Sequence, residues 1–203
     1  MSFETTASSS ATDKWFISDA QFNSLYPEPI QALSKTHWTP LNAAKEAARF
    51  LAAEKSARIL DIGSGVGKFC LAAAHYQPDA FYYGVEQRKY LVDHAEAARL
   101  TLGYENVSFI HANFTALDLK AYHHFYFYNS FYENLAPINR IDETVEYSNE
   151  LYHRYTRRLL LQLEAMPGGT RLATLCCSEE DMPADFHVVG SSLDDYLKFS
   201  IKI

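Results

Sequence analysis

The sequence has few cysteines and no long apolar run. It contains three cysteines in 203 residues, and two of these, Cys176 and Cys177, are adjacent. Thiols placed in this way form neither a disulfide framework nor a spaced zinc site. No stretch of about 18 apolar residues is present, which leaves no candidate for a membrane-spanning helix. Residues 1–14 are rich in serine and threonine and lack the apolar core of a signal peptide. These absences favour a cytoplasmic protein without a bound metal.

Basic residues are also scarce. Lysine and arginine total 18 against 25 aspartate and glutamate residues, so the formal net charge is −7. A charge of this sign disfavours binding to extended nucleic acid, which proteins contact through Lys and Arg. The basic group at His153, Arg154, Arg157 and Arg158 falls in an expected helix over 141–166, and we interpret it as a solvated helix face.

The stretch around three closely spaced glycines is the most informative part of the chain. An apolar run at 59–62, interrupted by Asp61, leads into Gly63, Gly65 and Gly67, and an alanine-rich segment follows. A strand, a glycine turn and a helix N-terminus together form a nucleotide site, because backbone without Cβ lets a ligand approach closely. The dinucleotide fingerprint is excluded, because Lys68 stands where it requires glycine. The P-loop is excluded in the same way by Phe69, which stands where it requires Ser or Thr.

The pattern Asp-x-Gly-x-Gly-x-Gly instead resembles the first motif of class I S-adenosylmethionine-dependent methyltransferases. The resemblance implies S-adenosylmethionine as cofactor, with its amino-acid end on the glycine turn and its ribose on a carboxylate after the next strand. The run 80–86 is strand-like and ends in Glu86, about 23 residues after Gly63. A carboxylate offers two acceptor oxygens to a ribose diol. The cofactor-binding residues that the resemblance implies for these two motifs are Asp61, Gly63, Ser64, Gly65, Gly67, Glu86 and Gln87.

Two further positions are implied to lie beside the cofactor. Asn113 and Phe114 follow a strand-like run at 107–112, where the family places an acid or amide near the adenine and an apolar neighbour on its ring. Thr39 precedes Pro40, and such a Thr-Pro step lies beside the cofactor in several branches of the family. From the residues alone, Thr39 is expected to be the N-cap of a helix whose first residue is Pro40.

The segment after the aromatic run 125–128 resembles a substrate loop. Asn129-Ser130-Phe131-Tyr132 is similar to the Asn/Asp-Pro-Pro-Phe/Tyr loop of amine methyltransferases, with both prolines replaced. Together with Gly63–Gly67 and 83–86, the pattern Asn129-x-Phe131 is nearer to the non-SET histone-lysine methyltransferase branch and its small prokaryotic relatives. The likeness covers about residues 38–133. It implies that Asn129 accepts a hydrogen bond from an amine and also adjoins the cofactor. Phe131 and Tyr132 then line the methyl channel, and Glu133 is a candidate to orient or deprotonate the amine.

The alternation of strand and helix patterns predicts a doubly wound α/β fold. We expect a mostly parallel seven-stranded sheet with a reversed terminal strand and helices on both faces. The chain is expected to divide into an N-terminal arm, residues 1–37, partly disordered or helical and covering the site, and a methyltransferase domain, residues 38–203.

The sequence leaves the methyl acceptor open. The leading hypothesis is in-line transfer to an amine nitrogen, such as that of a protein lysine. The alternatives are transfer to a small molecule or nucleobase, or a cofactor-binding but catalytically silent regulatory module. A nicotinamide dehydrogenase is disfavoured by Lys68. The sequence identifies neither a general base nor an oligomeric state.

Overall fold

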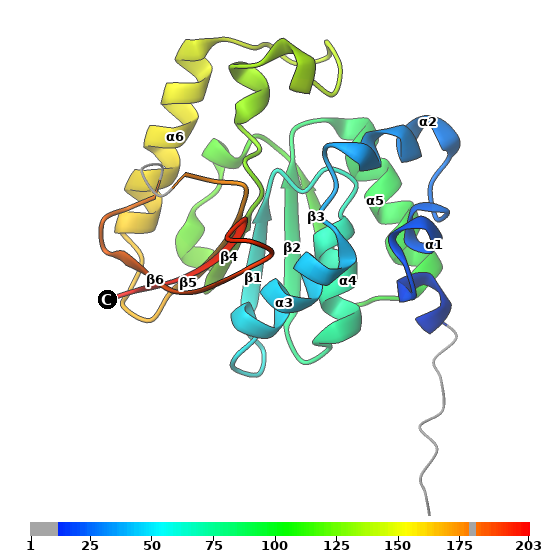
Figure 1. Cartoon of the computed structure of the whole chain (residues 1–203), viewed down its shortest axis with the longest axis horizontal. Coiled ribbons are helices and arrows are strands. Elements are labelled where there is room, and N and C mark those ends of the chain that lie inside the picture. The colour runs from blue at the N-terminus through cyan, green and yellow to red at the C-terminus, as the bar shows by residue number, and fades with distance from the viewer. Residues whose placement is uncertain (1–11, 179–181) are drawn as a thin grey trace, which may run out of the picture.

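The computed structural model describes residues 12–178 and 182–203. In these residues, strands form one sheet with the order β3-β2-β1-β4-β5-β7-β6 (Figure 1). β1 to β5 run parallel to one another, and β7 runs antiparallel to both β5 and β6. This confirms the predicted seven-stranded, doubly wound sheet with a reversed terminal strand. The strands are β1 (Arg58–Ile62), β2 (Phe81–Glu86), β3 (Val107–His111), β4 (His124–Phe127), β5 (Arg171–Leu175), β6 (Phe186–Ser192) and β7 (Leu197–Lys202).

Helices cover both faces of the sheet, as Figure 1 shows. Within the described residues, no helix is both long and apolar enough to cross a membrane. The α-helices are α1 (Asp19–Asn23), α2 (Glu28–Gln31), α3 (Leu41–Leu51), α4 (Lys68–Tyr76), α5 (Lys89–Leu102) and α6 (Asn149–Glu164). The 3-10 helices are η1 (Asp13–Phe16), η2 (Ala32–Lys35), η3 (Phe114–Ala116), η4 (Leu119–Ala121), η5 (Tyr132–Asn134) and η6 (Pro137–Asn139).

The two faces of the sheet carry two separate apolar clusters. Successive residues of a strand point to opposite faces, so Ile59 packs with α3 and α4, whereas Leu60 packs with the opposite cluster. On the first face, Phe69 of α4 stacks on Tyr126 with ring centroids 3.9 Å apart. On the second, Leu159 of α6 packs with the inward residues of β1 and β4. β1, β4 and β5 are therefore buried on both sides, whereas β3 at the edge of the sheet is only partly buried.

The start of α3 differs from the prediction. The helix begins at Leu41 with Pro40 as its N-cap, and the Thr39 side chain makes no capping bond. The Thr39 hydroxyl lies 3.0 Å from the hydroxyl of Tyr126 instead, and the N–H of Leu41 donates to Asp19 Oδ1. The predicted cap was wrong because a distant aspartate in the arm satisfies the helix N-terminus, which frees Thr39 to bond to the sheet.

The start of α6 also differs from the prediction. The expected helix over 141–166 begins only at Asn149, where the Ser148 side chain accepts a hydrogen bond from the N–H of Leu151. The residues before it bond elsewhere, since Asp142 and Tyr147 are both partners of Arg88. Apolar spacing alone does not show this, because the competing partner lies more than 50 residues away.

The arm is packed into the main core over its described part. Residues 1–11 of the expected arm lie outside the described residues. Phe22 is fully buried and Tyr26 nearly so, and both belong to the cluster that contains α3 and α4. The Tyr26 hydroxyl donates to the carbonyl of Val66 in the glycine turn at 2.9 Å. The arm and the sheet thus share one core.

We expect Phe22→Ala to destabilise the whole molecule rather than loosen the arm alone. Removing a buried phenylalanine ring costs roughly 3–5 kcal/mol. Because Phe22 belongs to the shared core, unfolding in urea followed by circular dichroism should stay a single transition with a lower midpoint. Ile17, which is 72% exposed, provides the control, and Ile17→Ala should leave the midpoint nearly unchanged. A separate early transition for Phe22→Ala would mean that the arm is an independent unit.

Candidate functional site

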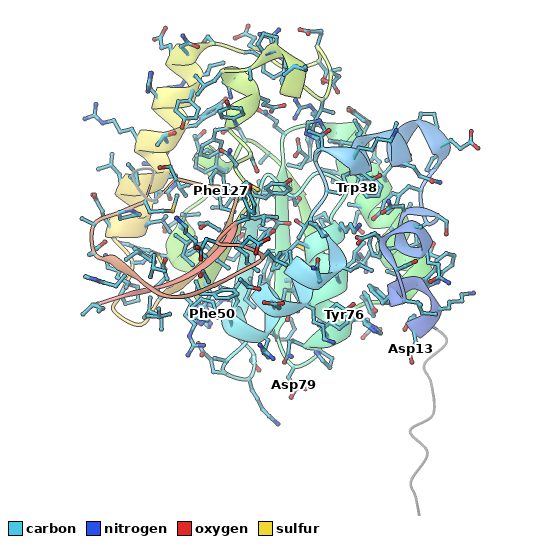
Figure 2. All side chains as sticks on the ribbon, viewed as in Figure 1. Asp13, Trp38, Phe50, Tyr76, Asp79 and Phe127 are labelled. Carbon is cyan, nitrogen blue, oxygen red and sulfur yellow. The ribbon has the colours of Figure 1, made fainter. Side chains whose placement is uncertain are left out.

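A cavity of about 350 Å³ opens at the carboxyl ends of the parallel strands. β1 lies between β2 and β4, so the chain changes winding direction at this point, where open α/β sheets bind their ligands. Figure 2 places Asp79, which precedes β2, at the lower edge of the sheet, and Trp38 and Phe127 towards the opposite edge. The volume lies within the usual range of small-molecule pockets, roughly 300–1,000 Å³.

All predicted site residues except Gly67 line this cavity. Their binding and catalytic roles stay predictions, but the structure brings together segments far apart in the sequence. The lining residues among them are Thr39, Asp61, Gly63, Ser64, Gly65, Glu86, Gln87, Asn113, Phe114, Asn129, Phe131 and Tyr132.

The glycine turn is built from left-handed backbone. Gly63, Gly65 and Gly67 have φ of 79°, 53° and 80°. A Cβ on Gly63 would lie 2.4 Å from the Ser130 hydroxyl, and one on Gly67 would lie 2.3 Å from the Phe109 ring, whereas one on Gly65 would meet nothing within 4 Å. Two of the glycines therefore admit neighbouring protein atoms, and Gly65 faces the open space of the cavity.

Glu86 is buried but keeps acceptor capacity. Its Oε2 accepts a hydrogen bond from the N–H of Gly65 at 3.2 Å, and its Oε1 accepts one from the N–H of Arg88 at 2.9 Å. A carboxylate has about four acceptor positions, so Oε2 keeps one for a hydroxyl, whereas Oε1 also lies 3.5 Å from Arg88 Nη1. Glu86 can therefore accept a hydrogen bond from a ribose hydroxyl beside the open face of Gly65.

Asp61 is a buried carboxyl group next to the turn. The Cys70 thiol donates to its Oδ2 at 3.8 Å. Burial raises the pKa of Asp61 to about 8, and the nearby charge of Glu86 acts in the same direction. At neutral pH the group is consequently protonated.

The Asn113 amide is fully engaged by protein atoms. Its oxygen accepts hydrogen bonds from the N–H and the hydroxyl of Thr115, and its nitrogen donates to Tyr155 at 2.8 Å and to Gln87. An adenine contact through this oxygen, as the resemblance implies, requires the Thr115 hydroxyl to turn away. Phe114 packs beside it, with its ring stacked on Phe131 at 5.0 Å.

The loop after β4 forms the opposite wall of the cavity. Asn129 has a φ of 38°, in the left-handed region that non-glycine residues seldom occupy. The Ser130 hydroxyl donates to the carbonyl of Ile62 at 2.9 Å, which fixes the loop to the end of β1. Phe131 is buried among aromatic rings, while Tyr132 is 42% exposed at the rim. The loop thus presents an amide and an accessible ring on a rigid base.

Several lining residues were not identified from the sequence. Arg88 is almost fully buried and pairs with Glu86, Glu133 and Asp142. Its proximity to Glu86 in sequence was a signal, but its other partners lie more than 40 residues away. The Glu133 carboxylate, a candidate from the sequence to orient an amine or to be a surface or helix N-terminal group, accepts a hydrogen bond from Arg88 at 2.7 Å.

Two more lining residues come from the arm and from α4. Lys68 is buried and donates to Asp19 at 2.5 Å and to Asn23 at 3.1 Å, which ties α1 to the start of α4. Burial lowers the pKa of His37, and the charge of Arg88 lowers it further, so this imidazole is neutral at pH 7. Within residues 12–178 and 182–203, no group of three His, Cys, Asp or Glu side chains is arranged to hold a metal ion.

Comparisons with known proteins identify relatives of the chain. A family model described as a methyltransferase domain matches residues 53–187. The tRNA (guanine-N(7)-)-methyltransferase of Synechococcus sp. (strain JA-3-3Ab) is 54% identical over 54 residues, which are 27% of this chain and 23% of that protein. The same enzyme from Synechococcus sp. (strain JA-2-3B'a(2-13)) is 52% identical over an equal length. The match therefore spans about a quarter of these curated relatives.

Solved structures share the fold. TrmN from Thermus thermophilus has a TM-score of 0.56 at 18% identity, covering 81% of this chain and 49% of that chain. An RNA methyltransferase from Salinibacter ruber, in complex with S-adenosyl-L-homocysteine, has a TM-score of 0.55 at 16% identity, covering 87% and 91%. An S-adenosylmethionine-dependent O-methyltransferase from Thermotoga maritima has a TM-score of 0.55 at 18% identity, covering 87% and 72%.

Gly63→Ala should disturb the loop after β4. Left-handed backbone at a non-glycine residue costs of order 1–3 kcal/mol, and here the added methyl group also displaces Ser130. Gly103→Ala is the matched control, because Gly103 has a φ of 72° and open space at its Cβ. Both variants should lose stability in urea unfolding, but only Gly63→Ala should speed amide exchange in residues 129–132. Equal exchange in the two variants would contradict the proposed contact.

The buried Asp61 should make stability fall with rising pH. The folded state holds the proton up to about pH 8, whereas an unfolded aspartate releases it near pH 3.9. Between these values the folded state binds more protons, so the free energy of unfolding decreases by at most about 1.4 kcal/mol per pH unit and levels off above the folded pKa. Asp61→Asn should lose this slope, which urea unfolding between about pH 5 and 9 measures. Asp79→Asn, at an exposed site, controls for the loss of a carboxylate. A wild-type slope retained in Asp61→Asn would contradict the assignment.

Proposed function

We propose that this chain, which belongs to the methyltransferase domain family and uses S-adenosylmethionine, methylates a nitrogen atom of an RNA base. The reaction class and the methyl donor come with the family, and the acceptor is the new part of the proposal. The curated relatives are named as tRNA guanine-N7 methyltransferases, which supports a base as acceptor. Since the match spans about a quarter of those relatives, the acceptor has to be argued from the cavity.

The observation that carries the proposal concerns the loop after β4, residues 129–134, which we call the acceptor wall. Its carboxylate, that of Glu133, is already bound by Arg88. Glu133 accepts from the Arg88 guanidinium at 2.7 Å and is 10% exposed, so it is not free to receive a cationic amine. What the wall offers is the Asn129 amide and the exposed ring of Tyr132. Flat bases are recognised by stacking on aromatic rings and by hydrogen bonds to their edges. This wall therefore suits a neutral flat ring better than an ammonium group.

Glu86 is the proposed ribose ligand, with the open face of Gly65 beside it. S-adenosylmethionine supplies an already activated methyl group, so the protein has mainly to align the acceptor. Asn129 would bond to the edge of the base while Tyr132 stacks on it, and the Ser130 hydrogen bond to Ile62 keeps both in place. Such alignment is worth roughly 7–11 kcal/mol of barrier in well-oriented reactions.

The acceptor nitrogen decides whether a proton must be removed. An aromatic ring nitrogen such as guanine N7 carries its own lone pair and needs no base.

The N-terminal arm contributes to the lining of the cavity through Leu33, Thr36 and His37. We therefore propose that the arm belongs to the catalytic unit and covers the site.

A second candidate acceptor is an amine, such as a protein lysine. The pattern Asn129-x-Phe131 favours it, since that loop resembles those of amine and histone-lysine methyltransferases. A lysine ammonium must lose a proton before its nitrogen can attack, and the neutral imidazole of His37 in the cavity wall is a candidate to accept that proton. The two acceptors differ in their need for His37, which makes them separable by experiment.

Asn129→Gly should strongly reduce turnover while the protein still binds the cofactor. Glycine accepts the φ of 38° without strain, so the variant removes the amide and keeps the loop. We expect turnover to fall about 100-fold, as for the loss of a well-placed polar group at a reacting centre. The assay transfers tritiated methyl from S-adenosylmethionine to unmodified RNA transcripts, followed by nucleoside mass spectrometry. Calorimetry with S-adenosylhomocysteine measures binding.

The control and the outcomes separate the candidates. Tyr196→Ala, at an exposed residue of the loop before β7, should leave turnover unchanged. Labelling of a protein fraction but not of RNA, with activity lost in His37→Ala, would replace the base by an amine. Binding of S-adenosylhomocysteine with no labelling of RNA, protein or small-molecule fractions would favour a catalytically silent module. Full RNA turnover in Asn129→Gly would overturn the role of the amide.

A further inference from the structure

One buried arginine joins the two sides of the cavity. The Arg88 side chain is 2% exposed and lies directly after the predicted ribose site. Its Nη1 lies 3.5 Å from Glu86 Oε1, and its Nη2 donates to Glu133 Oε2 at 2.7 Å. Arg88 therefore contacts a carboxylate at the end of β2 and another in the loop after β4.

The same guanidinium reaches the segment before α6. Arg88 Nε donates to Asp142 Oδ1 at 3.3 Å, and Nη2 also donates to the Tyr147 hydroxyl at 2.7 Å. Asp142 in turn accepts hydrogen bonds from Tyr90 and Thr144. These bonds hold residues 142–147 out of the helix that their sequence favours. Neither Asp142 nor Tyr147 lines the cavity, so the contacts extend beyond the ligand site.

The charges in this cluster depend on one another. Burial raises the pKa of Glu133 while Arg88 lowers it, and the charge of Glu86 raises it again. Three carboxylates share one guanidinium. A ligand that donates hydrogen bonds to Glu86 weakens the attraction between Glu86 and Arg88, and this changes how strongly Arg88 binds Glu133 and Asp142. A ligand shifts a conformational equilibrium only when it interacts more favourably with one conformation than with the other. Hydroxyl groups that donate to Glu86 favour the conformation in which Arg88 binds Glu133 and Asp142 more strongly.

We propose that Arg88 is a positioning residue that couples ligand binding at Glu86 to the placement of the acceptor wall. This inference rests on the proposed function, because it takes Glu86 as the ribose ligand. When hydroxyl groups bond to Glu86, Arg88 bonds more strongly to Glu133, Asp142 and Tyr147. The loop after β4 and residues 142–147 are then ordered before the acceptor arrives. By linkage, loosening this segment weakens ligand binding at Glu86.

Tyr147→Phe tests the coupling from outside the cavity. The variant removes one hydroxyl, which accepts a hydrogen bond from Arg88 and donates one to the carbonyl of Asp142, and it leaves every lining residue in place. The affinity for S-adenosylhomocysteine, measured by calorimetry, should fall about three- to tenfold, within the net value of a typical intramolecular hydrogen bond. In the wild type, S-adenosylhomocysteine should slow amide exchange in residues 132–148, and the variant should lose most of this protection.

Tyr82→Phe is the matched control. Its hydroxyl donates to the carbonyl of Gln77 at 2.9 Å at the other end of β2, so the variant loses a similar bond away from the cavity. It should lower thermal stability and leave both the affinity and the protection unchanged. Arg88→Lys provides a second test, because it keeps the charge and loses the fork that reaches several partners. It should weaken binding and abolish the protection.

A double-mutant cycle distinguishes coupling from simple loss of stability. Tyr147→Phe and Glu86→Gln should be non-additive in affinity, because Arg88 connects the two side chains. Additive losses, or wild-type affinity and protection in Tyr147→Phe, would overturn the coupling. If the wild type binds S-adenosylhomocysteine with the expected protection but methylates no RNA, the acceptor proposal fails and the coupling stands. If the wild type binds no S-adenosylhomocysteine, both fail.

Discussion

The contact between Gly63 and Ser130 is the constraint on which the whole site depends. β1 and β4 are parallel neighbours with Ile62 opposite Phe127, so the turns that follow them must meet at the same edge of the sheet. The absence of a side chain on Gly63 lets the Ser130 hydroxyl occupy that space and donate to the carbonyl of Ile62. The glycine turn and the loop after β4 are thereby built as one unit.

Two buried basic side chains, Lys68 and Arg88, connect the other elements of the site to this unit. Lys68 at the start of α4 ties the arm to the glycine turn through Asp19, which also satisfies the N-terminus of α3. Arg88 plays the same part on the other side, between the end of β2 and the segment before α6. A buried charge without its partner is strongly destabilising, so each of these contacts fixes the geometry as well as adding to stability. The cavity wall is therefore assembled from elements that no local pattern connects.

The sequence predicted those features that depend on neighbouring residues. The glycine turn, Glu86 at the end of its strand and the alternation of strands and helices are all local, and each was placed correctly. Predictions went wrong where a distant side chain competed with a local preference. Asp19 accepts the hydrogen bond at the N-terminus of α3 that Thr39 was expected to cap. Bonds to Arg88 hold the residues before Asn149 outside α6, so this helix begins later in the sequence than expected. Arg88 itself could not be assigned, because its partners are set by the packing of separate elements.

The charge inventory of the cavity bears on the kind of nitrogen that can be methylated. Asp61 is protonated at neutral pH because burial raises its pKa, and Glu133 shares the guanidinium of Arg88 with Glu86 and Asp142. The carboxylate of Glu86 already accepts bonds from Gly65 and Arg88. On the proposed function, a lysine that arrives as its ammonium form would lose its hydration beside carboxylates that already accept hydrogen bonds, and it would still have to lose a proton before its nitrogen could attack. A neutral base would have no such cost and would gain the exposed ring of Tyr132. These contacts therefore favour the proposed flat neutral acceptor over an amine.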